Sequence, residues 1–450
     1  MISTYKMLYH SFSNYEKYAW GANEYRPISK VGHSANIFGT SNIGITIIDS
    51  LDTLHIAKLD KEYQKAREWI DKQFNPNVAN EVSVFEINIR LVGGLLAGYT
   101  LTNDKMFLDK AILVADRLLP AFNTPTGIPH ALIVLSSGST KNWNWAQGGC
   151  SILSELGTIH LEFQYLTQLS GKKNYLEIVE KIRTVIQKLS ENNMYYNYVN
   201  PVTGRWCQTH ASLGALGDSF YEYLLKSWLL SGKKDERARI MFYDAMKAAE
   251  EAMLRKTPTT NLLYFGDQKS GHLDLQMGHL TCFVGGLYGL SSQYVLNNDS
   301  KYQMDIAKGI AQTCHESYIR SATRLGPEAF HFERQDVEAK SLRENEKYYI
   351  LRPEAIETWF YLWRLTHEQI YRDWAWDAII SLEKYCRVDG GYTGIRDVYS
   401  VPPSHDDVQQ SFFLAETLKY LYLIYTEDSV IQLNKYVFNT EAHPFQIREI

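Results

Sequence analysis

The 450-residue sequence has little of what marks several common protein classes. Its formal net charge is −5, and its 46 lysine and arginine residues are scattered along the chain. Such a distribution offers neither the basic patch of a nucleic-acid binder nor a polybasic membrane segment. No apolar run is expected to reach transmembrane length, and residues 1–21 lack the hydrophobic core of a signal peptide. We therefore expect a soluble chain, as given, with no nucleic-acid partner and no membrane contact.

Cysteine is also sparse, and its spacing excludes the usual structural metal sites. The five cysteines, at positions 150, 207, 282, 314 and 386, form no CxxC pair and no zinc-type spacing. Their odd number leaves the redox compartment open. The sequence also has no serine nucleophile elbow and no phosphate-binding glycine loop. Zinc, acyl-transfer and nucleotide chemistry are thus disfavoured, and a lone glycosylation sequon at Asn298 adds little.

Helical periodicity dominates what is present. Stretches that are apolar nearly all round predict buried helices at 44–58, 84–98, 154–166, 217–230, 278–290, 348–365 and 410–425. Amphipathic, more charged stretches lie between them, at 60–72, 105–118, 174–189, 237–253, 303–320 and 370–385, with 5–18 as a further candidate. Buried helices therefore alternate with one-sided surface helices.

Each buried stretch carries a narrow polar stripe at helical spacing. Examples are Glu86 with Arg90, Glu155 with Glu162, Asp218 with Glu222, and Asp49 with Asp52. A ring of inner helices that turn their stripes to a common centre accommodates all of them. The sequence thus predicts an all-α fold, an (α/α)7 barrel of seven inner and seven outer helices. A helical solenoid or two helical domains are the alternatives, but the uneven spacings and the absence of a linker favour one catalytic domain over 1–450.

The connections between the predicted helices differ in length. Inner helices pass to outer ones through short turns, whereas outer helices return through long segments such as 120–149, 191–217 and 321–351. Long loops inside a compact domain are usually functional. We expect them on one rim, with short β-hairpins at turn signals such as Asn200-Pro and Asp389-Gly, and we expect the site to open there.

The stretch 348–365 indicates what that site does. Glu354 and Glu357 lie three residues apart, behind Arg352 and Pro353, on a helix that is otherwise apolar. Burial of an unpaired charge is costly, so these groups form either a structural ion pair or an acid–base site with altered pKa values. Glu86 with Arg90 could likewise be a structural pair, and His279 a core histidine. Carboxylates without a metal cluster point to glycoside hydrolysis, with retention or inversion left open.

Ten motifs in order resemble a known family. They include YAWGANEYRP, IIDSLDTL, SVFEINIRLVGGLL, GDSFYEYLLK, MGHLTCF, LGPEAF, YYILRPE and VFNTEAHPF. From about Tyr15 to Pro444 the chain is similar to the class I α-mannosidases, glycoside hydrolase family 47, and most similar to its Golgi mannosyl-oligosaccharide 1,2-α-mannosidases. The resemblance implies an inverting, Ca²⁺-dependent hydrolase that removes terminal α1,2-linked mannose from high-mannose N-glycans. A glycan-binding factor of glycoprotein quality control that does not hydrolyse is the alternative.

The resemblance also implies roles for single residues. Glu354 matches the proposed base, Glu86 a proposed acid that acts through a water, and Asp218 the other candidate acid; Glu328 is a further acidic pocket residue. Residues that match the sugar subsite are Arg90, Glu222, His279, Arg352, Glu357, Phe412, Glu416 and Glu441. Leu216 stands where relatives that trim one branch carry arginine, which implies a broader branch range.

The remaining expectations concern metal, cysteine pairing and location. Thr440 matches the calcium ligand, and Cys282 with Cys314 matches the family's disulfide. These imply the oxidising lumen of the Golgi or ER. Family members typically carry a membrane anchor, which this chain lacks as given. We expect a monomer whose partners are the N-glycans of glycoproteins.

Overall fold

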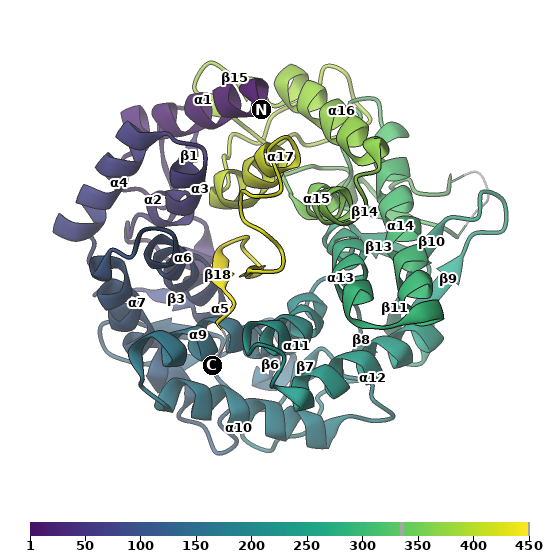
Figure 1. Cartoon of the computed structure of the whole chain (residues 1–450), viewed down its shortest axis with the longest axis horizontal. Helices are drawn as coiled ribbons and strands as arrows, with labels where there is room; N and C mark the ends of the chain where they lie inside the picture. The colour runs from purple at the N-terminus through teal and green to yellow at the C-terminus, as the bar shows by residue number, and fades with distance from the viewer. Residues whose placement is uncertain (334–336, 449–450) are drawn as a thin grey trace.

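The computed structural model describes residues 1–333 and 337–448, and its helices form two concentric rings (Figure 1). The outer ring consists of α1 (Ile2–Ala19), α4 (Asp60–Lys72), α7 (Lys105–Leu118), α10 (Asn174–Leu189), α12 (Glu236–Met253), α14 (Asn297–Ile319) and α16 (Gln369–Tyr385). The inner ring consists of α2 (Ile45–Asp49) with α3 (Leu51–Ile56), α5 (Val84–Glu86) with α6 (Gly93–Thr102), α8 (Leu153–Gly157) with α9 (His160–Ser170), α11 (Asp218–Leu230), α13 (Phe283–Ser291), α15 (Glu354–Thr366) and α17 (Leu418–Ile424). The predicted (α/α)7 barrel is confirmed.

Several inner helices are less regular than the periodicity predicts. The segment 44–58 divides at Ser50, and the segment 154–166 divides at Thr158. Two others contain π-helical turns, at Ile87–Val92 and Phe413–Thr417. A π turn adds one residue to the helical repeat and is frequent at functional sites. Here the turns carry Arg90 and Glu416, two of the predicted site residues.

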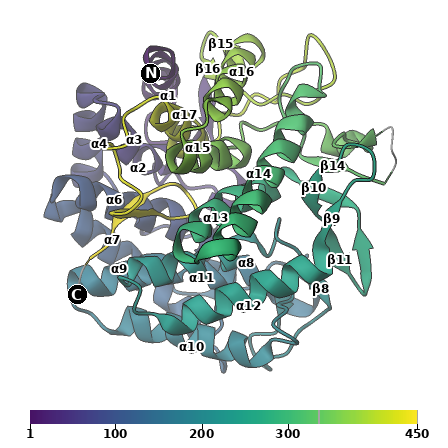
Figure 2. The same cartoon turned by 45° about the vertical axis from the view of Figure 1, so that its right-hand side comes forward.

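The long connections contain short antiparallel strands, as predicted. Their pairs are β1–β2 (Glu24–Arg26, Val31–His33), β3–β4–β5 (Glu81–Ser83, Leu132–Val134, Thr140–Lys141), β6–β7 (Ser151–Ile152, Tyr198–Val199), β8–β11–β12 (His210–Ala211, Asp267–Lys269, His272–Asp274), β9–β10 (Leu254–Lys256, Leu263–Phe265), β13–β14 (Gln276–Gly278, Ala329–His331), β15–β16 (Arg387–Val388, Gly391–Tyr392) and β17–β18 (Tyr436–Phe438, Pro444–Gln446). In Figure 2 the strands β9, β10, β11 and β14 extend from the side of the barrel.

One helical run changes an expectation from the sequence. The run Val84–Thr102 is long and apolar enough, by length and composition alone, to cross a membrane, so the expectation that no apolar run reaches this length is wrong. In the barrel, most of this run is buried. Its charged residue Arg90 contacts carboxylates inside the ring, and this is the arrangement of a core helix.

The hairpin β17–β18 closes the middle of the ring. Figure 1 shows it in yellow, inside the circle of inner helices. Phe445 of β18 stacks on Tyr165 of α9, with ring centroids 4.8 Å apart. Asn439 donates one amide hydrogen bond to the carbonyl of Ile89, 3.0 Å, and another to Glu162, 2.8 Å. The turn of this hairpin therefore lies at a fixed position on the barrel axis, at the foot of the site.

Candidate active site

A cavity of about 630 Å³ opens at the end of the barrel where the inner helices begin. This volume is within the usual range of ligand pockets, about 300–1,000 Å³. Its lining includes the predicted site residues Glu86, Arg90, Leu216, Asp218, Arg352, Glu354, Phe412, Glu416, Thr440 and Glu441. A deeper hollow of about 50 Å³ adds Glu222 and Glu357. Tertiary structure thus brings together residues from all parts of the sequence.

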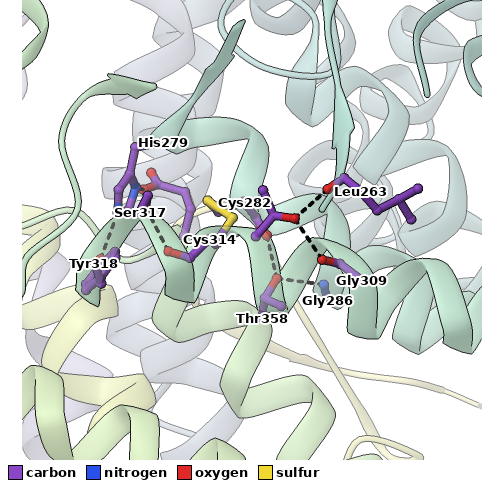
Figure 3. The surroundings of a disulfide bond; sticks show 11 residues. Leu263, His279, Cys282, Gly286, Gly309, Cys314, Ser317, Tyr318 and Thr358 are labelled. Carbon is purple, nitrogen blue, oxygen red and sulfur yellow. Dashed lines mark hydrogen bonds and ion pairs between the residues drawn. A yellow bond between two sulfur atoms is a disulfide. The ribbon is translucent and has the colours of Figure 1, made fainter. Parts of the chain in front are cut away.

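Glu354, the first residue of α15, is held by a histidine. His279 Nδ1 lies 2.8 Å from Glu354 Oε2, and because a carboxylate can only accept, Nδ1 carries the hydrogen. The other ring nitrogen lies 2.8 Å from the hydroxyl of Tyr318 (Figure 3). Burial alone would raise the pKa of Glu354, but His279 and the guanidinium of Arg352 outweigh it and lower this pKa below its ordinary value. Glu354 is therefore a carboxylate at neutral pH.

Arg352 has a second carboxylate partner. Its guanidinium donates to both oxygens of Glu328, at 2.5 and 2.7 Å, in a forked arrangement that fixes both side chains. The Arg352 Nη1 atom lies 4.0 Å from Glu354 Oε1. Glu328 therefore contacts the site through Arg352, and His279 through Glu354.

Asp218, the first residue of α11, has the opposite electrostatic character. One of its oxygens accepts from the backbone N–H of Ser219, 2.7 Å. Burial, with the nearby charges of Glu222 and Glu354, raises the pKa of Asp218 to about 7. One cavity thus holds a carboxyl group that keeps its proton up to neutral pH and a carboxylate that has lost it. Paired groups with separated pKa values are what acid–base catalysis requires.

The foot of the cavity carries an excess of acidic groups. Glu222 forms a buried ion pair with Lys226, 2.5 Å. Burial and then the charges of Glu222 and Glu354 raise the pKa of Glu357 well above its ordinary value. Burial together with Glu441, Glu357 and Glu354 does the same to Glu416. These carboxyl groups surround Thr440, in the turn between β17 and β18, and leave the site short of positive charge.

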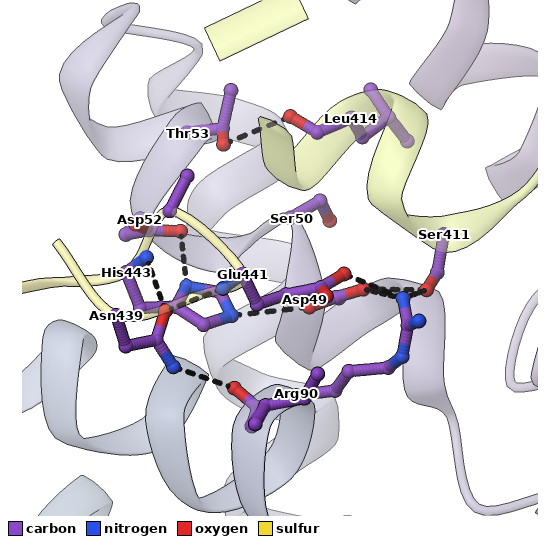
Figure 4. A network of polar contacts seen from close by, with 12 residues as sticks. Asp49, Ser50, Asp52, Thr53, Arg90, Ser411, Leu414, Asn439, Glu441 and His443 are labelled. Carbon is purple, nitrogen blue, oxygen red and sulfur yellow. Dashed lines mark hydrogen bonds and ion pairs between the residues drawn. The ribbon is translucent and has the colours of Figure 1, made fainter. Parts of the chain in front are cut away.

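Arg90 balances part of this charge from the π turn of its helix. It contacts Glu86 at 2.8 Å. It also contacts Glu441 at 2.5 Å and Asp49 at 3.4 Å, and its Nη1 donates to Ser411 at 3.0 Å (Figure 4). The helical pair Glu86–Arg90 is therefore part of a larger network. That network joins the second inner helix to the first inner helix, to Ser411 just before the last inner helix, and to the hairpin β17–β18.

A second, fully buried set of charges lies behind it. The two nitrogens of His443 lie 3.1 Å from Asp49 and 3.3 Å from Asp52, and Lys419 contacts Asp52 at 2.7 Å. Burial opposes the charge on His443, but the two carboxylates outweigh burial and raise its pKa. Loss of one partner from such a buried pair costs about 3–5 kcal/mol. These residues fix the hairpin that carries Thr440 and Glu441.

Comparisons with known proteins agree with this geometry. The sequence pattern of Glycosyl hydrolase family 47 matches residues 7–447. The chain belongs to this family. It is 55% identical over 445 residues to "Mannosyl-oligosaccharide alpha-1,2-mannosidase IA" of Drosophila melanogaster. That match covers 98% of this chain and 66% of the Drosophila protein. To "Mannosyl-oligosaccharide 1,2-alpha-mannosidase IB" of Homo sapiens it is 52% identical over 443 residues, 98% of this chain and 69% of that protein.

A solved structure extends the comparison to the fold of family 47. The "alpha-1,2-mannosidase from Trichoderma reesei" superposes with a TM-score of 0.90 at 26% identity, over 99% of this chain and 98% of that one. The chain spans about two thirds of the length of the curated relatives that it matches. The resemblance recognised in the sequence is confirmed, and so is the fold that it implied.

The cavity is also lined by residues that were not predicted from the sequence to belong to the site. Glu155, which lay on a predicted polar stripe but received no role, accepts from the indole N–H of Trp143 at 2.9 Å. Burial raises the pKa of Glu155 to about 8. Trp143 and Trp145 line the cavity as well, and both lie in a long loop without periodicity. Only the stripe of Glu155 offered a signal in the sequence.

The structure contains two disulfides. Cys282 and Cys314 are joined within the core, behind His279, as the family resemblance implies (Figure 3). Cys150 and Cys207 form a second disulfide that the sequence analysis did not anticipate. Cys386 is a buried free cysteine.

Proposed function

We propose that this chain hydrolyses terminal α1,2-linked mannose from high-mannose N-glycans, with inversion at the anomeric carbon. The curated relatives are named for 1,2-α-mannosidase activity on mannosyl-oligosaccharides. The observation that carries the proposal is the pair of carboxyl groups with opposed pKa shifts, Asp218 and Glu354, on one cavity. This pair provides a proton donor and a base at the same pH.

The proposed roles follow from these contacts. Glu354, ionised and oriented by His279, removes a proton from the water that attacks the anomeric carbon. The leaving oxygen receives a proton from Asp218 or, through a water, from Glu86. Phe412 offers its ring to the apolar face of the mannose. Arg352 donates hydrogen bonds to the hydroxyl groups of this sugar, and Glu441 accepts hydrogen bonds from them. Glu328, Glu222, Glu357, Glu416 and Arg90 hold these groups in place.

Release of free mannose from a high-mannose oligosaccharide tests this proposal. Proton NMR of the first product formed distinguishes inversion, which gives β-mannose, from retention. A family member that only binds glycans would show saturable binding without release, and this outcome would favour the quality-control alternative.

A calcium ion at Thr440 is the second part of the proposal. The hydroxyl and carbonyl oxygens of Thr440 are hard donors of the type that Ca²⁺ binds. The raised pKa values of Glu357 and Glu416 indicate a site short of positive charge, which fits a divalent cation. Within 1–333 and 337–448, no group of three or more His, Cys, Asp or Glu side chains is arranged to hold a metal directly, so these carboxylates would act on an ion through waters. When bound, Ca²⁺ supplies a positive charge for sugar hydroxyls.

The proposed location is the lumen of the secretory pathway, in the Golgi or ER. Two disulfides in one chain suit an oxidising compartment. The N-glycan substrates inferred from the relatives are found in the same lumen. We propose that the chain acts there as a monomer.

The pH dependence of kcat/KM should reflect the two opposed carboxyl groups. Since Asp218 must be protonated to act as an acid and its pKa is about 7, kcat/KM should fall as pH rises through about 7. Since the pKa of Glu354 is lowered, the acidic limb should lie below the ordinary range of a glutamate. Initial rates across pH check both limbs. A fall near pH 7 that persists in the residual activity of Asp218→Asn would assign it to another group, such as Glu155.

Leu216 is proposed to set the range of branches that the enzyme accepts. It lines the cavity mouth two residues before Asp218, with a left-handed φ of 75°. Its side chain offers no hydrogen-bond donor, whereas an arginine carries five in a rigid fork. We therefore expect the wild type to remove several α1,2-linked mannoses, with little preference for a single one.

Leu216→Arg should accordingly narrow trimming towards one branch. Chromatographic profiles of the glycan products measure this, and Leu216→Met is the matched control because it keeps the volume without adding a donor. An unchanged order of products in a well-folded Leu216→Arg protein would rule out this role.

A further inference from the structure

One side of the cavity mouth is built from two chain segments outside the helical rings. Residues 142–152 contribute Trp143 and Trp145, and residues 207–216 contribute Leu216. The two indoles stack with ring centroids 6.0 Å apart and planes 24° apart, and Trp145 exposes 58% of its surface. We call Trp143, Trp145 and Leu216 the mouth wall. It presents apolar surface to anything that enters the cavity beyond the innermost sugar.

Little apolar burial supports this wall. Beneath it lies a small cluster of four buried residues, Ala146, Cys150, Ile152 and Tyr198, which is separate from the main core. The turn Gly148–Gly149 has positive φ at both residues, and no neighbouring atom lies within 4 Å of where either Cβ would be. Polar contacts also hold this segment, since the side chain of Asn142 donates to the carbonyl of Gly149 at 2.6 Å and β6 pairs with β7. With so little apolar burial, these contacts alone leave the wall able to open at low free energy.

The Cys150–Cys207 disulfide adds a covalent tie to these hydrogen bonds. Cys150 directly follows the Gly148–Gly149 turn, and its partner lies 57 residues later, after α8, α9 and α10. Cys207 is itself placed by its backbone N–H, which donates to Tyr198 at 2.9 Å. Trp143, Cys207 and Leu216 all pack against the same small cluster. One covalent bond therefore joins the segment that carries the tryptophans to the segment that leads to Leu216.

We propose that the Cys150–Cys207 disulfide positions the substrate by holding the mouth wall in the arrangement that binds the oligosaccharide beyond the scissile mannose. This inference rests on the proposed hydrolysis of high-mannose glycans. Neither cysteine lines the cavity, so both are positioning residues that act through Trp143, Trp145 and Leu216. Their loss should affect the binding of long substrates and leave the chemistry at Glu354 intact.

The Cys282–Cys314 disulfide supplies a matched control. Cys282 and Cys314 are fully buried in the main core, and Cys282 lies three residues after His279, which orients Glu354. Removal of this disulfide should lower thermal stability and should affect the turnover of substrates of all sizes alike. Cys207, by contrast, is partly exposed at the rim.

The test compares Cys150→Ala/Cys207→Ala with Cys282→Ala/Cys314→Ala on an α1,2-linked mannose disaccharide and on an intact high-mannose oligosaccharide. For Cys150→Ala/Cys207→Ala we expect KM for the oligosaccharide to rise by about fivefold or more over the wild type. Its kcat, and both KM and kcat for the disaccharide, should stay within about twofold of the wild type. In a second measurement, brief treatment of the wild type with a dithiol, followed by alkylation and peptide mapping, opens the partly exposed bond first and should reproduce the rise in KM.

Three results would overturn the proposal. They are an unchanged KM for the oligosaccharide, an equal loss on both substrates, or free thiols at both positions in the oxidised protein. If the wild type releases no mannose from either substrate, the proposed function fails instead. Calorimetric binding of the same oligosaccharide then tests the inference. Weaker binding by Cys150→Ala/Cys207→Ala than by the wild type supports it, and equal binding by the two proteins refutes it.

Discussion

Glu354→Gln is expected to lower kcat by about 10²–10⁴-fold while oligosaccharide binding is kept, because a positioned general base contributes about that factor. The substitution keeps the shape of the side chain and removes the charge that accepts the proton from water. His279 can still donate from Nδ1 to the amide oxygen, so the local hydrogen bond from His279 is retained. Single-turnover rates and calorimetric binding measure the two effects separately.

Glu316→Gln is the matched control for this substitution. Glu316 also pairs with a cation, Arg320 at 2.9 Å, but it lies on an outer helix away from the cavity. Its turnover should equal that of the wild type. If Glu354→Gln hydrolyses substrate at a rate close to the wild type, Glu354 is not the base and the proposed roles of the acids must be reassigned.

Removal of calcium is expected to abolish activity and to lower the thermal unfolding midpoint. A ligand that binds only the native state stabilises it by about 2.7 kcal/mol when present at a hundred times its Kd. The acidic foot of the cavity, with Glu222, Glu357 and Glu416 around Thr440, gains most from a cation. Activity and the midpoint are measured after exhaustive chelation and again after Ca²⁺ is returned.

Thr440→Val separates the metal from other effects of chelation. Valine keeps the shape of threonine and removes the hydroxyl ligand, so the variant should lose most of the stabilisation that Ca²⁺ gives to the wild type. Full activity after chelation, together with no metal in elemental analysis, would contradict a calcium site at this position.

Much of the barrel could be predicted because helical burial is periodic in the sequence. The predicted surface helices 60–72, 105–118 and 174–189 coincide with α4, α7 and α10. The carboxyl groups at 86, 155, 218 and 354 could be recognised as candidates because a charge within an apolar helix is costly without a function or a partner. Family motifs then added Thr440 and the pairing of Cys282 with Cys314, which no periodicity indicates.

The sequence by itself determined the alternation of buried and surface helices, the polar stripes and the family. Only the tertiary structure decided which charges meet. Asp52 and Lys419 form a buried ion pair although 367 residues separate them, and Arg90 contacts Glu441 across 351 residues. The tertiary structure likewise decided that Cys150 pairs with Cys207 and that Trp143 lies at the cavity. Periodicity records which face of a helix is buried, but contacts between distant segments depend on how the ring closes and on the hairpin in its middle.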